Sequence, residues 1–355
     1  MKKSIILIIS VTLGIVALIL LGSVLQIGDK LGRIGAPLEY GFYILILALL
    51  VAFVAIPVIR VHCAPQMPAL TTDGVVDAEK LSQLGTMLER NCSYIPDDEA
   101  RKAHRAALRQ SLKDAGTDVA LASRAINDEI TYRLEGDADR SVEGAVLGIN
   151  RKIKEWARTV FLVTAISQNS KFDSLAVIAI NYKMIEDIVL STGFRPTRPQ
   201  MIKLYARVLT TSLVSYLASD ALGDFSSDIA RTMPDLSDSA AELAESGLSG
   251  NRFLDSLKRA RIPGIIFGSA LDGAINALLT LRIGYVTRSY ILKGAEALSG
   301  KESRRSIRLA AMRDAHRSIP SVIMNSAGVI GKSAASRLVK FFTFQSGGGE
   351  EAFAD

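Results

Sequence analysis

Two long uncharged stretches near the start of the chain constrain its fold more than any other feature. Residues 4–27 contain no Asp, Glu, Lys or Arg and consist mainly of Ile, Leu and Val, and residues 41–59 show the same pattern. A helix of about 20 apolar residues crosses the roughly 30 Å hydrocarbon core of a bilayer. The connector between the stretches is too short to recross it. The sequence therefore predicts a transmembrane helical hairpin within residues 1–63, with both ends on one side.

A secretory signal peptide is the alternative for the first stretch, because Lys2 and Lys3 precede it. The apolar part of a signal peptide usually has roughly 7–15 residues, and this stretch is longer. A spanning helix is therefore favoured. The long remainder after Arg60 has no clear export feature, so we expect the N-terminus and the bulk of the chain to be cytoplasmic.

Composition excludes several classes of chemistry. Two cysteines in 355 residues are too few for a disulfide framework or a site built from about four thiolates. The three histidines, His62, His104 and His316, lie far apart in the sequence and form no short ligand pair. We therefore predict no metal site and no cofactor.

The rest of the chain is expected to be all-α, because apolar residues recur every three or four positions and no stretch alternates as a strand does. A linker and helical spacer is predicted for residues 64–141 and a helical domain for 142–345. The glycine-containing tail, residues 346–355, is expected to be disordered.

Two segments carry a resemblance to a known family. The run TAISQNSKFDSLAVIAINYKMIEDIVLSTGFRPT at residues 164–197, with LDGAINALLTLRIGYVTRSYI at 271–291, resembles the YcjF-like bacterial inner-membrane proteins and the uncharacterised domain that they share with some GTPases. The resemblance implies a multi-pass protein of the bacterial inner membrane, with a membrane hairpin, a helical middle and this C-terminal domain. It also implies the lipid bilayer and a GTPase-like protein as partners, but no settled activity.

Small residues recur at Gly264, Gly268 and Gly273 in an otherwise apolar segment. Such spacing lets two helix backbones approach closely. Packing within the chain is the favoured interpretation. Self-association into a homo-oligomer and a third membrane span are the alternatives, and the span is disfavoured because Asp272 would lie near its centre.

Polar residues within apolar helices are the strongest candidates for a functional site. We expect Asp173, Asp272 and Arg282 to be buried, with one of the aspartates paired to Arg282, because buried charges are normally paired. No nucleophile and base have a recognisable spacing, so no catalytic residues are predicted. Ser326 to Ser333 resembles a phosphate-binding loop, but Ser326 replaces its first glycine, and a glycine-interrupted helix is favoured.

Three arginines, Arg304, Arg305 and Arg308, lie within about one helical turn. A solvated helix face and contact with the anionic membrane surface are the two interpretations. Nucleic acid is not a predicted partner, because no aromatic residues interleave these arginines.

The sequence as a whole favours a non-enzymatic membrane protein that acts as a scaffold or partner of a GTPase-like protein. The alternative is a pore or transporter with additional membrane-embedded helices within residues 160–281.

Overall fold

The computed structural model describes residues 21–22, 24–68, 71–72, 75–138, 145–166, 170–219, 265–294, 301–332, 335–336 and 338–340. Most of the first predicted span, Gly264 and the tail at 346–355 therefore lie outside the described residues. The regular secondary structure of the described part is helical apart from two short strands, β1 (Thr71–Thr72) and β2 (Val75–Val76), which pair antiparallel. The all-α prediction is confirmed.

A single long apolar helix leads into the fold. It comprises α2 (Ala36–Leu50), the π-helical turn η1 (Val51–Ala55) and α3 (Ile56–Cys63). Pro57 follows the π turn at the start of α3, and proline lacks the amide hydrogen that an α-helix would use there. The helix is 28 residues long and only 6% of its most apolar window is buried. By length and composition it could cross a membrane, the one such helix among the described residues.

Residues 24–32 are also helical and are followed by a turn before α2 begins. A side-chain carbon placed on Gly28 would collide with the Tyr43 ring, and one placed on Gly32 would meet Glu39. The two helical segments therefore lie against each other at this end of the chain.

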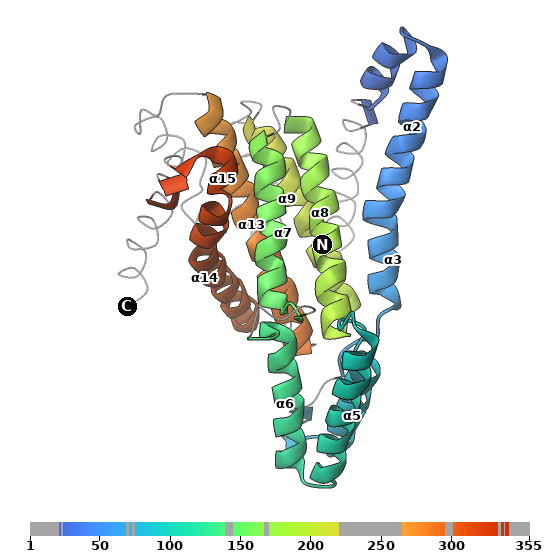
Figure 1. The fold of residues 1–355 in the computed structure, drawn as a ribbon, viewed down its shortest axis with the longest axis vertical. Coiled ribbons are helices and arrows are strands. Elements are labelled where there is room, and N and C mark those ends of the chain that lie inside the picture. The colour runs from blue at the N-terminus through green and yellow to red at the C-terminus, as the bar shows by residue number, and fades with distance from the viewer. Residues whose placement is uncertain are drawn as a thin grey trace.

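Three helices form a small unit at the lower end of Figure 1: α4 (Ala78–Arg90), α5 (Asp98–Ala115) and α6 (Val119–Glu135). Each is preceded by an N-cap aspartate, Asp77, Asp97 or Asp118, whose carboxylate accepts hydrogen bonds from backbone amides of the first turn. Both α5 and α6 end at a glycine with positive φ, Gly116 and Gly136. These local signals fix where the helices start and stop.

The largest part of the molecule is a helical bundle. Its members are α7 (Ile149–Ile166), α8 (Ser170–Thr192), α9 (Arg198–Ser219), α13 (Ile265–Lys293) and α14 (Lys301–Asn325), followed by the short α15 (Ala327–Ile330). The central helix α13 packs against α7, α8, α9 and α14. Fully buried side chains at this centre include Ile153, Phe161, Met184, Ile188 and Leu278.

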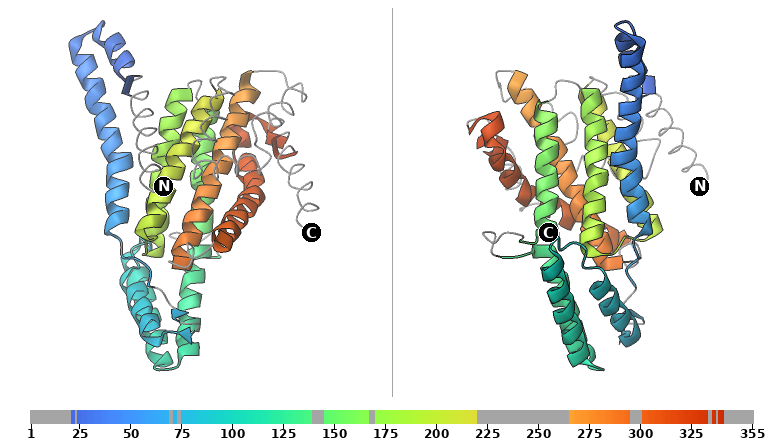
Figure 2. Two further views of the ribbon diagram at one scale, coloured as in Figure 1. Left: turned by 180° about the vertical axis from the view of Figure 1, so that it is seen from behind. Right: turned by 45° about the vertical axis from the view of Figure 1, so that its right-hand side comes forward.

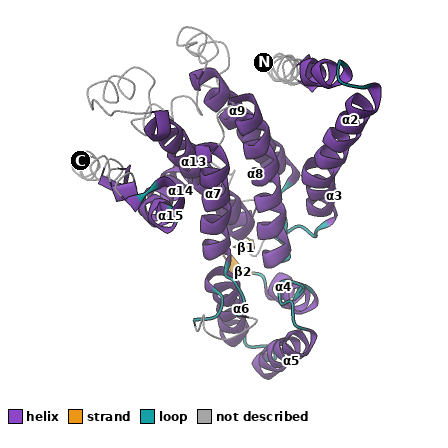
Figure 3. Ribbon diagram, turned by 45° about the horizontal axis from the view of Figure 1, so that its top comes forward, coloured by secondary structure: helices purple, strands orange, loops and turns teal. Residues whose placement is uncertain are grey.

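The apolar helix is docked on one side of this bundle. Both α3 and η1 pack against α8, whereas α2 leans away from the bundle, as Figure 1 and the left view of Figure 2 show. Figure 3 shows the same arrangement from the upper end, with α2 standing apart and the α4–α6 unit beyond the opposite end of the bundle.

Candidate functional site

A buried arginine joins the α4–α6 unit to the bundle. Arg133 of α6 is 3% exposed, and its guanidinium donates hydrogen bonds to the backbone oxygens of Leu88 (2.8 Å), Asn91 (3.1 Å) and Thr192 (2.7 Å). These oxygens lie at the C-terminal ends of α4 and α8, where unpaired carbonyls and the helix dipole favour a cation. One side chain thus closes the ends of two helices from different parts of the fold.

Glu129 neutralises this arginine from one turn earlier in α6. Its carboxylate accepts a hydrogen bond from Arg133 Nε (2.7 Å), one from the Tyr94 hydroxyl (3.0 Å) and lies 2.8 Å from His104 Nε2. Burial alone would raise the pKa of Glu129, but the hydrogen bond from His104 and the charge of Arg133 together lower it below its ordinary value. The His104 ring also stacks on Tyr132.

This geometry predicts acid sensitivity. Because the pKa of folded Glu129 is lowered from its ordinary value of about 4.5, its stabilising contribution is complete above that pH and is lost as pH falls through the lower folded value. We expect the thermal midpoint of the full chain to fall in this range, and to fall less in a Glu129→Gln variant. Circular dichroism measures both. Equal acid dependence of the two chains would contradict the assignment.

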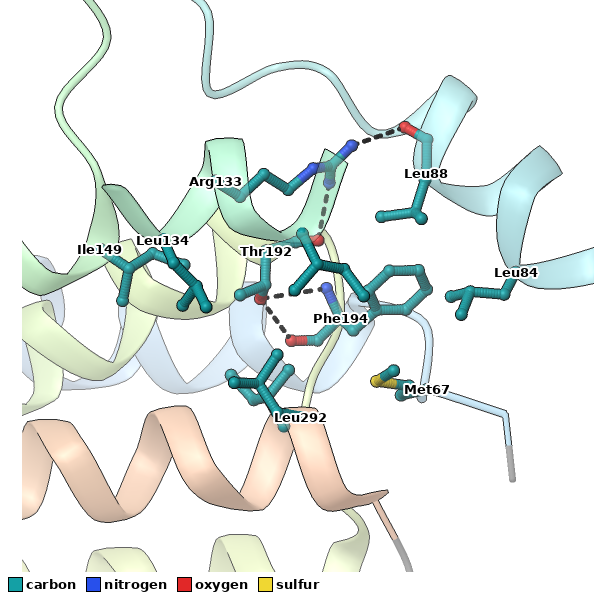
Figure 4. Close-up of a pocket in the computed structure, with 11 residues that line it drawn as sticks. Met67, Leu84, Leu88, Arg133, Leu134, Ile149, Thr192, Phe194 and Leu292 are labelled. Atoms are coloured by element: carbon teal, nitrogen blue, oxygen red, sulfur yellow. Dashed lines mark hydrogen bonds between the residues drawn. The ribbon is translucent and has the colours of Figure 1, made fainter. Parts of the chain in front are cut away.

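The cavity in Figure 4 lies at the same junction. It is lined by Met67, Leu84, Leu88, Ile130, Arg133, Leu134, Ile149, Thr192, Phe194, Ile291 and Leu292. Figure 4 shows Arg133 reaching the Leu88 and Thr192 oxygens at its edge, while the Thr192 hydroxyl bonds to the Phe194 backbone. Its volume of about 20 Å³ holds about one water molecule. It is too small for a substrate, so the junction has the character of a structural joint.

A second junction fastens the apolar helix to α8. Arg60, near the end of α3, donates a hydrogen bond to Glu186 at 3.1 Å, and the same carboxylate accepts one from Lys183 at 2.9 Å. Just beyond α3, Arg195 donates through Nε to the Ala64 oxygen and through its backbone amide to the Pro65 oxygen, both at 2.9 Å. The end of the apolar helix is therefore held at two points along the bundle.

Gly264, Gly268 and Gly273 form the glycine stripe predicted from sequence, and the structure describes the surroundings of Gly273 alone among them. A side-chain carbon on Gly273 would lie 2.9 Å from the Phe161 backbone oxygen and 3.1 Å from Ala165 Cβ. This glycine therefore permits a close approach of α13 to α7 within the chain. Gly268 belongs to α13, but the structure does not describe its surroundings. Gly264 lies outside the described residues. Self-association through this stripe stays a prediction.

The predicted set of buried polar residues needs a correction. Arg282 is buried at 6% exposure, whereas Asp272 is exposed. Both belong to α13, ten residues apart, which separates them by roughly 15 Å along the helix. The predicted pairing of Asp272 with Arg282 is therefore wrong. Asp173 lies in the first turn of α8, and its side chain is outside the described residues.

The C-terminal candidates also have defined positions. Arg304, Arg305 and Arg308 lie in the first half of α14, with Arg305 exposed and the other two half-buried. The segment that resembles a phosphate-binding loop starts at Ser326, directly after α14. A phosphate-binding loop follows a strand, so this preceding helix contradicts the resemblance. Among the described residues no group of three potential metal ligands is found.

Sequence reasoning missed both junctions. One signal for the first was present: Ile126, Glu129, Ile130 and Arg133 recur at three- and four-residue spacing on α6, which places a charged pair on an apolar face. The second joins residues 126 apart in sequence, and no local pattern pairs Arg60 with Glu186.

Comparison with known proteins identifies part of this architecture. Residues 146–315 match the family model described as "Domain of unknown function (DUF697)". The match covers α7, α8, α9 and α13 together with the first part of α14. It confirms an uncharacterised domain in the C-terminal part of the chain. Neither the curated proteins nor the solved structures gave a match.

Proposed function

We propose that this protein is a membrane-anchored, non-enzymatic scaffold. The observation that carries the proposal is the apolar helix of α2, η1 and α3, which is almost uncovered by the rest of the chain and yet is fastened to the bundle through Arg60 and Glu186. A helix of this apolarity needs a covering of low polarity. Because α3 and η1 also pack against α8, we expect the bundle to move with the helix, as a scaffold requires.

The finer assignment rests on the sequence resemblance. We place the protein in the bacterial inner membrane as a multi-pass protein, with a GTPase-like protein as its partner and a homo-oligomer as a further state. The contact between residues 24–32 and the start of α2 supports a hairpin. The α4–α6 unit extends from the bundle, and its position leaves it accessible to a protein partner.

Orientation gives the first test of this proposal. A reporter fused after Asp355 is expected to be cytoplasmic, and one inserted at Gly35, between the two predicted spans, is expected to face the periplasm. The physical reason is that an even number of spans returns the chain to its starting side. A periplasmic signal at both positions would exclude the hairpin.

The partner requires a separate experiment. We expect affinity purification of the full chain from membranes to co-purify a GTPase-like protein, and Arg60→Met with Glu186→Met to leave that association intact because the α4–α6 unit is unchanged. Recovery of the chain without any such protein would contradict the GTPase-like partner and would not affect the proposed membrane anchoring.

A further inference from the structure

The apolar helix and α8 run side by side in the same direction. Arg60 bonds to Glu186 at 3.1 Å, and residues 66 and 195 form a parallel bridge just beyond. Since Ser170 precedes Glu186 by sixteen residues, and both helices rise about 1.5 Å per residue, the start of α8 is level with about residue 44 of α2. The bundle therefore stands beside the apolar helix over most of the height of residues 41–59.

The outward face of α7 changes character along its length. Its exposed residues in the lower part are Lys154, Glu155 and Arg158, whereas those near its end are Val163 and Ile166, which are 37% and 65% exposed. No charge follows Arg158 in this helix. The end of α7 away from the α4–α6 unit thus presents hydrocarbon side chains outward.

The other bundle helices show the same division in their sequences. Charges are absent from residues 159–166 of α7, 174–182 of α8, 208–219 of α9, 273–281 of α13 and 318–325 of α14, which we call the charge-free half of the bundle. At about 1.5 Å per residue these segments are roughly 12–18 Å long, close to half of a 30 Å hydrocarbon core.

A belt of basic residues borders this half. The bordering charge on each helix is Arg60 on α3, Arg158 on α7, Lys183 on α8, Arg207 on α9, Arg282 on α13 and Arg317 on α14. Contacts between helices place them at similar heights. Asn181 of α8 bonds to Thr280 of α13 at 3.3 Å, and Tyr285 of α13 bonds to Ser318 of α14 at 2.7 Å. The Tyr182 ring of α8 packs on Tyr205 of α9, and Gly284 of α13 lies against Ile153 of α7. Basic residues are favoured at the cytoplasmic membrane interface.

We infer that the charge-free half of the bundle lies in the same bilayer leaflet as the lower part of the apolar helix, with the basic belt at the headgroups. This rests on the proposed anchoring. The apolar helix is uncovered and needs lipid around it, and the charge-free half stands at its side at the same height, so the lipid that covers one surrounds the other.

On α8 and α13, three charged residues lie beyond the belt, at the far end of these helices. Lys171 and Asp173 are in the first turn of α8, and Asp272 is within about two turns of the start of α13. Asp272 is exposed, whereas the side chains of Lys171 and Asp173 lie outside the described residues. Ionisable residues at membrane depth are costly and occur mainly at functional positions.

Single cysteines test the inference in the full chain. In a background with Cys63→Ser and Cys92→Ala, we expect Ile166→Cys to resist a membrane-impermeant maleimide in opened membranes and to react after denaturation in SDS. Lys154→Cys, an exposed site on the same helix below the belt, should react at once. Leu47→Cys in α2 reports on the anchor and should be protected.

Fluorescence separates lipid from protein as the cover. With Trp156→Phe removing the single tryptophan, Ile166→Trp should be quenched by phospholipids with brominated acyl chains, and Lys154→Trp should be quenched far less.

Rapid labelling of Ile166→Cys beside a protected Leu47→Cys would overturn the inference and leave the anchor. Labelling of Leu47→Cys would overturn the anchor itself. Protection of Ile166→Cys without quenching of Ile166→Trp would mean that protein, a second copy or a partner, covers the site, which also overturns the inference.

Discussion

Replacing Arg133 with methionine is expected to lower the free energy of unfolding by about 3–5 kcal/mol, the usual cost of breaking a buried ion pair from one side. The substitution leaves Glu129 charged and buried, and it removes the donor to the carbonyls of Leu88, Asn91 and Thr192. Thermal unfolding of the full chain in detergent, followed by circular dichroism, measures the loss.

The matched control for Arg133 is Arg151→Met. Arg151 also pairs with a glutamate four residues away, Glu155, but on the exposed surface of α7. We expect this variant to unfold within about 0.5 kcal/mol of the unchanged chain. If Arg133→Met proved as mild as Arg151→Met, the buried junction would not be holding the α4–α6 unit to the bundle.

The second large effect is expected at Gly273. Leucine there would place its Cβ 2.9 Å from the Phe161 backbone oxygen and 3.3 Å from the Ala165 backbone nitrogen. Backbone atoms cannot rotate away as side chains do, so α13 and α7 must separate. We expect destabilisation near the upper end of the roughly 1–3 kcal/mol that overpacking usually costs, measured by the same thermal unfolding.

Gly328→Leu provides the control for this substitution. Gly328 lies in the short helix α15, is exposed, and has nothing within 4 Å of an added Cβ. We expect it to change the thermal midpoint little. Equal effects at Gly273 and Gly328 would show that the contact between α13 and α7 is looser than the structure indicates.

The helical class and the apolar helix could be predicted from sequence because both are local properties. Apolar residues at three- and four-residue spacing specify a helix, and an uncharged run specifies a segment that lipid can cover. The starts of α4, α5 and α6 follow from Asp77, Asp97 and Asp118 in the same local way.

The contacts between helices could not be predicted, because they depend on rotation and height that no local pattern fixes. Asp272 was expected inside the bundle because its neighbours in sequence are apolar, but it is exposed, about two turns from the start of α13. Glu129 and Arg133 look like an ordinary exposed pair at four-residue spacing until α4 and α8 cover them. The common position of the belt residues along the bundle axis becomes visible only when the six helices are placed side by side.

Extraction of membranes with alkaline carbonate tests the central claim, membrane anchoring, most directly. The treatment opens vesicles and releases proteins held only at the surface, whereas proteins with a membrane-spanning helix sediment with the lipid. We predict that the full chain remains in the pellet, because the 28-residue apolar helix is almost uncovered by protein. Quantitative release of the intact chain into the supernatant would contradict the account.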